Sequence, residues 1–304
     1  MDLEEIDLSD ANALTEELGV TGAALLAGDP PAPSSDPNAP EIEDPGDAVA
    51  FQGGDLTLGL DVASGDVAGV YLQIPGADSY FDIPSSALQG GRIAMEDQAF
   101  AIQLPDNIEP GTFCVDYCVY DSEARVSNIV NVCIEVGELG GANSEFLIGT
   151  WNVTMLVHVE DGETRTEIIG EATPDIYSVE IVCADGQTFE EVEIGESETI
   201  DFIKITFAEN GALRFEEDGE DTYLDFSTST CEVQVYLTET YSDDWAGAWS
   251  YEEANNRLVM VINEEEDGVE EQNVIDLNIS VTDKTMTGVL EVDGETTTVT
   301  LVKQ

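Results

Sequence analysis

Basic residues are nearly missing from this sequence. Of its 304 residues only 8 are Lys or Arg, against 66 Asp or Glu, which gives a formal net charge of −58. A protein that binds nucleic acid needs a basic surface to neutralise phosphates and release their counterions, so we exclude nucleic acid as a partner. The acids are spread along the whole chain, with 13 in residues 1–47, 14 in residues 48–144 and 39 in residues 145–304. This distribution is typical of a solvated or salt-adapted surface and does not mark one acidic patch.

Histidine and long apolar runs are also scarce. His158 is the only histidine, which argues against a Ser-His-Asp triad or a His-based zinc site. Strict alternation along its strand puts His158 on one face with Leu156, opposite Trp151, and we interpret it as an ordinary strand residue. No apolar run approaches the roughly 18 residues of a membrane span, and no phosphate-binding or dinucleotide motif occurs. The sequence therefore predicts a non-enzymatic protein with no cofactor, no metal and no transmembrane segment.

The beginning of the chain has a composition that cannot build a core. Residues 29–47 hold 6 of the 11 prolines, interspersed with Ser, Asp and Gly, as in extended linkers. Before them, only the stretch from Asp10 to Leu18 shows a weak helical pattern. Residues 1–47 are therefore predicted to form an acidic, Pro-rich tether.

Residues 48–138 change to a pattern of period two, with short apolar stretches separated by Gly, Pro, Asp and Ser. About seven short strands in some 90 residues predict an antiparallel sandwich of immunoglobulin-like (Ig-like) type. These strands are expected at Leu56–Val62, Val70–Ile74, Tyr80–Ile83, Arg92–Met95, Phe100–Leu104, Thr112–Tyr120 and Ile129–Val136.

Three of the five cysteines lie on the last two of these strands. Cys114 and Cys118 are four residues apart on one strand, about 13 Å, and cannot bridge each other. A four-residue turn at Ser122–Arg125 sets a register that puts Cys114 opposite Cys133. We favour that disulfide with Cys118 left free; three reduced cysteines packed as small hydrophobes are the alternative.

Turn dipeptides dominate residues 145–304. Asp-Gly occurs at 161, 185, 218, 267 and 293, and Asn-Gly at 210. Such dipeptides favour tight hairpin turns, and a meander this long normally closes to remove its edges. An up-and-down β-barrel of eight to ten strands is therefore expected. Its strands are predicted at Trp151–Val159, Thr164–Gly170, Phe202–Phe207, Ala212–Glu216, Thr222–Phe226, Glu232–Thr238, Ala248–Tyr251, Arg257–Ile262, Val274–Val281, Thr285–Val292 and Thr296–Lys303.

Several motifs in this half resemble the lipocalin-like domains of Bacteroidetes surface lipoproteins. The motifs are Gly149-Thr150-Trp151, Ile205-Thr206-Phe207-Ala208-Glu209-Asn210-Gly211, Trp249-Ser250-Tyr251 with Asn255-Asn256-Arg257-Leu258, and Val299-Thr300-Leu301-Val302-Lys303. The resemblance implies that Trp151 closes the barrel floor and that Lys303 packs over it in a cation–π contact. It also implies a disulfide between Cys183 and Cys231, which flank the Asn-Gly hairpin. The fold class expected overall is all-β, an Ig-like β-sandwich followed by a lipocalin-like β-barrel.

Location follows from the same resemblance. The stretches Gly111–Cys118 and Val126-Ser127-Asn128 are similar to the Ig-like modules of such lipoproteins. Those proteins carry a leader and a lipidated cysteine, neither of which this sequence has, so the resemblance implies a removed leader and a lipid anchor upstream of residue 1. Cysteine pairing fits an oxidising compartment, and we expect an extracellular or cell-surface protein.

Three functions remain open at this stage. The leading hypothesis is a cell-envelope or secreted binding protein whose barrel holds a small apolar or amphipathic ligand, with candidate contacts Tyr241, Trp245, Trp249 and Tyr251. The alternative for these aromatics is that they fill the barrel and cover its end. The second hypothesis is an adhesion module that contacts glycans or envelope proteins through the Ig-like domain. The third is a hydrolase that uses a pair of carboxylates, which the sequence alone does not show.

Overall fold

The structure of the protein is a computed structural model that describes residues 5–89, 98–160, 162–266, 269–292 and 294–304. The chain divides into two compact units. The first contains Met1–Gly141 with Ala248–Ser250 and Val261–Val274, and the second contains Ala142–Gly247, Tyr251–Met260 and Ile275–Gln304. Strands dominate both, and no helix within the described ranges is long and apolar enough to cross a membrane. The strand predicted at Arg92–Met95 lies outside the described residues.

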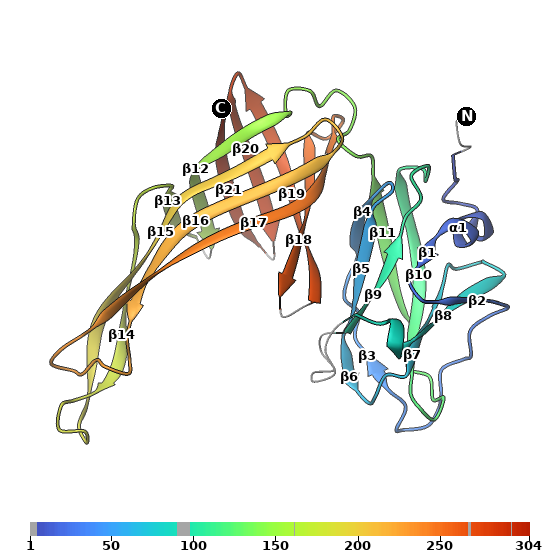
Figure 1. The fold of residues 1–304 in the computed structure, drawn as a ribbon, viewed down its shortest axis with the longest axis horizontal. Helices are drawn as coiled ribbons and strands as arrows, with labels where there is room; N and C mark the ends of the chain where they lie inside the picture. Colours follow the sequence, from blue (N-terminus) through green and yellow to red (C-terminus); the bar gives the residue numbers. More distant parts are fainter. Residues whose placement is uncertain (1–4, 90–97, 161, 267–268, 293) are drawn as a thin grey trace. The chain divides into compact units, whose positions relative to one another are not determined.

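The first unit is built from three sheets (Figure 1). The largest has the order β2-β8-β7-β10-β11-β4, in which β4 runs parallel to β11; a second has the order β1-β9-β5, and β3 pairs with β6. Buried side chains from all three sheets form one apolar core. The elements are α1 (Ala11–Glu17), β1 (Gly19–Val20), β2 (Ala24–Ala27), β3 (Glu41–Ile42), β4 (Ala48–Phe51), β5 (Asp55–Leu60), β6 (Val62–Ser64), β7 (Gly69–Gln73), β8 (Ser79–Pro84), β9 (Gln98–Gln103), β10 (Gly111–Tyr120) and β11 (Val130–Gly137).

The cysteine prediction for this unit is confirmed. Strands β10 and β11 pair in the expected register, with Cys114 opposite Cys133, and the two form a disulfide. Cys118 is free and buried. Burial, with a smaller contribution from nearby Asp116, raises the pKa of its thiol to about 12. Because the thiolate is the reactive form, Cys118 is a packing residue.

The predicted tether at residues 1–47 is wrong. Leu14 on α1 is fully buried, and Leu18 and Ile6 belong to the same core. Strand β1 pairs with β9 and β2 pairs with β8, so the segment extends two existing sheets. The prolines are compatible with this arrangement because they lie outside the paired strands: β1 and β2 end before Pro30, and β3 lies between Pro40 and Pro45. A few apolar side chains at irregular spacing were enough to anchor it.

Replacing Leu14 with Ala tests this integration. We expect the variant to lose about 2–4 kcal/mol of unfolding free energy, because a fully buried leucine leaves a cavity. Urea unfolding followed by circular dichroism measures the loss, with the exposed neighbour Glu16→Ala as the control. If the two variants were equally stable, Leu14 would not contribute to the core, and residues 1–47 would again be interpreted as a tether.

Residues 149–303 form a closed eight-stranded antiparallel barrel with the order β12-β21-β20-β19-β18-β17-β16-β15, which the pairing of β15 with β12 closes. Two further strands lie on it, β13 beside β12 and β14 beside β15. The predicted barrel is thus confirmed. Its strands are β12 (Gly149–Glu160), β13 (Glu163–Ile168), β14 (Thr173–Val182), β15 (Phe189–Phe207), β16 (Ala212–Leu224), β17 (Tyr236–Glu252), β18 (Arg257–Glu266), β19 (Val269–Thr282), β20 (Thr285–Val292) and β21 (Glu295–Lys303).

Several of these strands are longer than predicted. Strand β16 runs through Asp218-Gly219, where the sequence predicted a turn, and β17 joins two predicted strands into one of 17 residues. The glycine has a different purpose: a Cβ on Gly219 would lie 2.5 Å from the Tyr241 ring and 2.7 Å from the Thr199 carbonyl oxygen. Gly219 is therefore needed for a close approach between strands.

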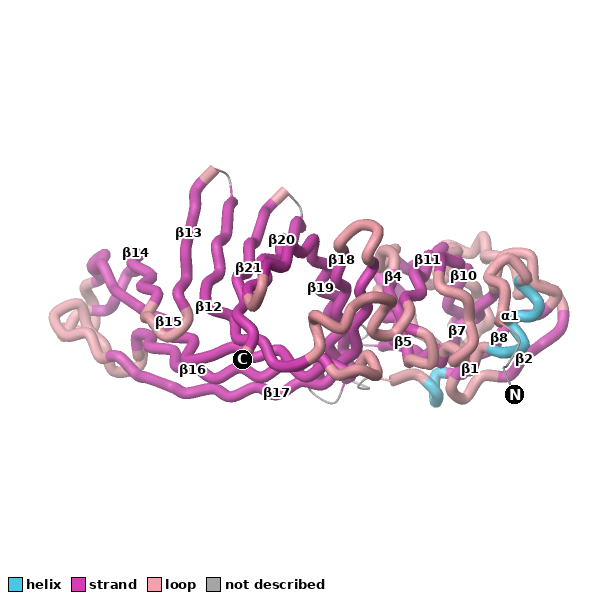
Figure 2. Tube along the Cα trace, turned by 90° about the horizontal axis from the view of Figure 1, so that it is seen from above, coloured by secondary structure: helices cyan, strands magenta, loops and turns pink. Residues whose placement is uncertain are grey.

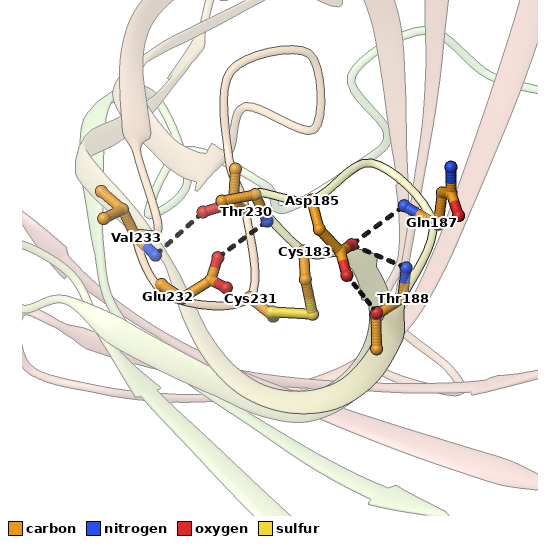
Figure 3. Close-up of a disulfide and its surroundings, with 9 residues drawn as sticks. Cys183, Asp185, Gln187, Thr188, Thr230, Cys231, Glu232 and Val233 are labelled. Carbon is orange, nitrogen blue, oxygen red and sulfur yellow. Dashed lines mark hydrogen bonds between the residues drawn. A yellow bond between two sulfur atoms is a disulfide. The ribbon is translucent and has the colours of Figure 1, made fainter.

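The extra length of β15, β16 and β17, together with β14, makes an arm that extends beyond the barrel (Figure 1). We define the arm as residues 173–198 and 220–240. Ile181, Ile194 and Leu224 form a small core of its own. At its tip Cys183 and Cys231 form the disulfide that the resemblance implied (Figure 3).

A hydrogen-bonded aspartate orders the turn beside this disulfide. The Asp185 carboxylate accepts hydrogen bonds from the Thr188 hydroxyl and from the backbone N–H groups of Gln187 and Thr188, the latter two at 2.9 and 2.8 Å (Figure 3). These bonds, that of the Thr188 side chain first, lower the pKa of Asp185 to about 2. The charged carboxylate is therefore the form that stabilises the turn.

This shift predicts a pH dependence. Because the folded-state pKa lies below the unfolded value of about 3.9, the stabilisation by Asp185 is present above that value and is lost as the pH falls through about 2. The thermal midpoint of Asp185→Asn should therefore lie below that of the wild type at pH 5 and converge with it towards pH 2. Asp175→Asn, on β14, removes the same charge from the arm without touching the turn. A wild-type advantage that persisted unchanged at pH 2 would contradict the assignment.

Candidate functional site

The barrel interior holds an apolar cavity of about 210 Å³. Fifteen described residues line it; fourteen are apolar and the remaining one is Thr297. They come from β12, β15, β16, β18, β19, β20 and β21, whose side chains alternate between the interior and the outer surface. The side chains of the barrel therefore leave part of its interior empty.

Trp151 lies near the start of β12. It is fully buried, its indole N–H donates to the Leu147 carbonyl oxygen at 2.7 Å, and it pairs directly with Lys303 and Ile205 on the two neighbouring strands. The Lys303 ammonium lies 5.4 Å from the centre of the indole ring and donates to the Phe146 carbonyl oxygen at 2.7 Å. The structure thus brings Trp151 and Lys303 into the contact that the resemblance implied.

A β-bulge in β12 corrects the expected orientation of His158. The register of β12 against β21 shifts between Val153 and Met155, so Thr154 is an extra residue. Because side chains alternate with period two, one inserted residue exchanges the faces of everything that follows. Val153 and Leu156 both line the cavity, and His158, two residues beyond Leu156, lies on the inner face with Trp151. The prediction that His158 faces away from Trp151 is wrong.

Beyond His158 the lining becomes polar. His158 Nδ1 lies 3.0 Å from the Thr297 hydroxyl, and its Nε2 lies 3.7 Å from the Glu167 carboxylate. Arg165 Nε also contacts Glu167, at 3.0 Å. Figure 2 shows the two hairpins β12–β13 and β20–β21 next to each other. A polar depression is lined by residues at the ends of β12, β13 and β21. We call this depression, which Glu160, Glu163 and Glu295 also line, the mouth.

The mouth adjoins the apolar cavity. Thr297 on β21 lines both the mouth and the cavity, and it pairs with His158 on β12. Sequence reasoning missed this arrangement, since the inward orientation of His158 depends on the bulge. A run of threonines at 296–298 was the one visible sign of a polar change on β21.

The four aromatic candidates on β17 have different environments. Trp249 is fully buried, and Tyr251 is buried with its ring against Phe146 at 5.2 Å. Trp245 is half-buried against Phe215, a cavity-lining residue, with ring centres 5.2 Å apart. Tyr241 lies nearer the arm. Among the described residues none of these four lines the cavity itself.

Tyr241 joins two carboxylates. Its hydroxyl lies 3.3 Å from Glu198 and 3.2 Å from Glu217. Burial is the main cause that raises the pKa of Glu217; the hydrogen bond from Tyr241 opposes this shift, and the charges of Asp243 and Glu198 add to it. This is the kind of environment that a hydrolytic acid needs. However, the hydroxyl occupies the space between the carboxylates, where a glycosidic oxygen or a water would have to lie.

One group of side chains has the spacing of a metal site. Ligand atoms of Cys183, Cys231 and Glu232 lie within 4.8 Å of one another. The two sulfurs are joined as a disulfide, and the Glu232 carboxylate accepts the Ala184 N–H at 3.0 Å (Figure 3). Because zinc binds thiolates, the oxidised pair cannot hold it.

Comparison with known proteins leaves the function to be argued from the site. No protein-family model and no curated protein matches the chain. Among solved structures, a quinoprotein alcohol dehydrogenase-like protein from Bacteroides thetaiotaomicron is similar to it at 10% identity, with a TM-score of 0.21, over 83% of this chain and 79% of that one. A likeness this distant carries no functional argument.

Proposed function

We propose that this chain is a non-enzymatic binding protein of the cell envelope or the secreted space. Its lipocalin-like barrel would hold a small apolar or amphipathic molecule, and its first unit would be an Ig-like sandwich. The observation that carries the proposal is the apolar cavity above Trp151. Two disulfides indicate an oxidising, non-cytoplasmic compartment, which supports the location.

The size of the cavity limits the ligand. An apolar cavity of about 150 Å³ stays dry and can bind benzene, so one of about 210 Å³ has room for an apolar group of about eight carbon atoms. Lining atoms without partners lose dispersion contacts, which a ligand would restore. Burying apolar carbon there is favourable by about 0.8 kcal/mol for each CH₂ group. A short alkyl chain or a single substituted ring fits these limits.

A cavity-filling substitution tests the proposal. Leu290 lines the cavity, whereas its neighbour Val289 points to the opposite face of β20. Leu290→Trp should lower the affinity for octan-1-ol at least tenfold because the indole takes the space of the alkyl chain. Val289→Trp, the matched control, should bind as the wild type does. Isothermal titration calorimetry measures both.

The outcome against the proposal is equally concrete. If Leu290→Trp remains folded and binds octan-1-ol as tightly as Val289→Trp, the alkyl chain does not enter the barrel. If the wild type takes up no octan-1-ol, and native mass spectrometry of protein from its own host shows no bound mass, the barrel is not a ligand site.

A further inference from the structure

Three rows of side chains cross the strands β13, β12 and β21 at the mouth. The innermost row is Glu167, Leu156 and Val299, and the next is Arg165, His158 and Thr297. In the outermost row Glu163 pairs with Glu160, and the pairing of Val159 with Thr296 puts Glu295 on the other side of Glu160. All nine residues line the mouth or the cavity, and the alternation of side chains puts them on the same face of their strands. Hence the rows change, from the cavity outward, from two apolar residues beside Glu167, to a polar row, to a row of three carboxylates.

The bases of this surface are directed inward. Arg165 contacts Glu167 at 3.0 Å, and His158 lies between Glu167 and the Thr297 hydroxyl. Among the described residues that line the mouth, these two are the only basic side chains. Both basic side chains contact Glu167 of the innermost row, and the outermost row consists of carboxylates.

The outermost row brings like charges together. Glu160 and Glu163 are direct cross-strand partners at the end of the β12–β13 hairpin, and Glu295 lies on the adjoining strand. Carboxylates placed directly opposite each other destabilise a sheet. A cation held between them would relieve that repulsion, whereas an anion would increase it, in a protein whose net charge is −58.

We propose that the natural ligand is a cationic amphiphile, an amine with an apolar group of about eight carbon atoms. Its apolar group lies in the cavity lined by Leu156 and Val299, and its ammonium lies among Glu160, Glu163 and Glu295. His158 and Thr297 separate the two regions. This inference rests on the proposed function, because the cavity must accept an alkyl chain, and it adds the charge of the head group.

The site combines the acidic row with an apolar cavity. Carboxylates are abundant over the entire chain, and a row of them is by itself unremarkable. Here the row lies next to an apolar cavity, and Thr297 lines both the mouth and that cavity. A molecule with its tail in the cavity must present its other end to this row.

Three probes with the same alkyl chain test the head group: octylammonium, octan-1-ol and octanoate. Calorimetry at 0.15 M salt should show octylammonium binding about tenfold more tightly than octan-1-ol, and octanoate binding more weakly than both. The triple variant Glu160→Gln, Glu163→Gln and Glu295→Gln should lose the preference for octylammonium and keep the affinity for octan-1-ol. The matched control, Glu180→Gln, Glu191→Gln and Glu193→Gln, removes the same charge from the arm and should keep the preference.

The results separate this inference from the proposed function. Binding of octan-1-ol without a preference for octylammonium would overturn the cationic ligand and leave the apolar site standing. An equal loss of preference in both triple variants would also overturn it, because the overall charge of the protein would then explain the attraction. If none of the three probes binds, both proposals fail.

Discussion

Along one edge, strand β12 pairs first with β15 and then with β13, and the rest of the barrel depends on this constraint. Residues Gly149–Asn152 pair with β15 and close the barrel, whereas Met155–Glu160 pair with β13. The first part of this edge of β12 thus closes the barrel, and the second part forms a hairpin with β13. The bulge at Thr154 lies between these two sections. Without it, Leu156 and His158 would point outward and the cavity would lose one wall.

This constraint also explains how a chain with so much negative charge encloses apolar space. Around the cavity the inward positions are apolar except for Thr297. Towards the mouth, polar side chains replace the apolar ones on the inner face, starting with His158 and Thr297. The arm continues the same strands away from the barrel and stabilises its tip with a disulfide and the hydrogen-bonded Asp185. Charged side chains thus become frequent where the strands extend beyond the cavity.

Local patterns made much of this fold predictable. The register of β10 against β11, and with it the Cys114–Cys133 disulfide, follows from a short turn and from alternation between two adjacent strands. Hairpin dipeptides identified the barrel for the same reason. What could not be predicted depends on distant partners. The ring of Tyr241 leaves room only for a glycine at position 219. The bulge at Thr154 can be recognised only from the register of β12 against β21. The core role of Leu14 was hidden because the sheets that its segment joins come later in the chain.

The most direct test of the account is a crystal structure of the protein under xenon pressure, because xenon occupies dry apolar cavities. The account predicts one xenon site enclosed by Leu156, Met286 and Val299, above the indole of Trp151 and below the ring of His158. No xenon there, with Leu156 on the outer surface of the barrel, would contradict it.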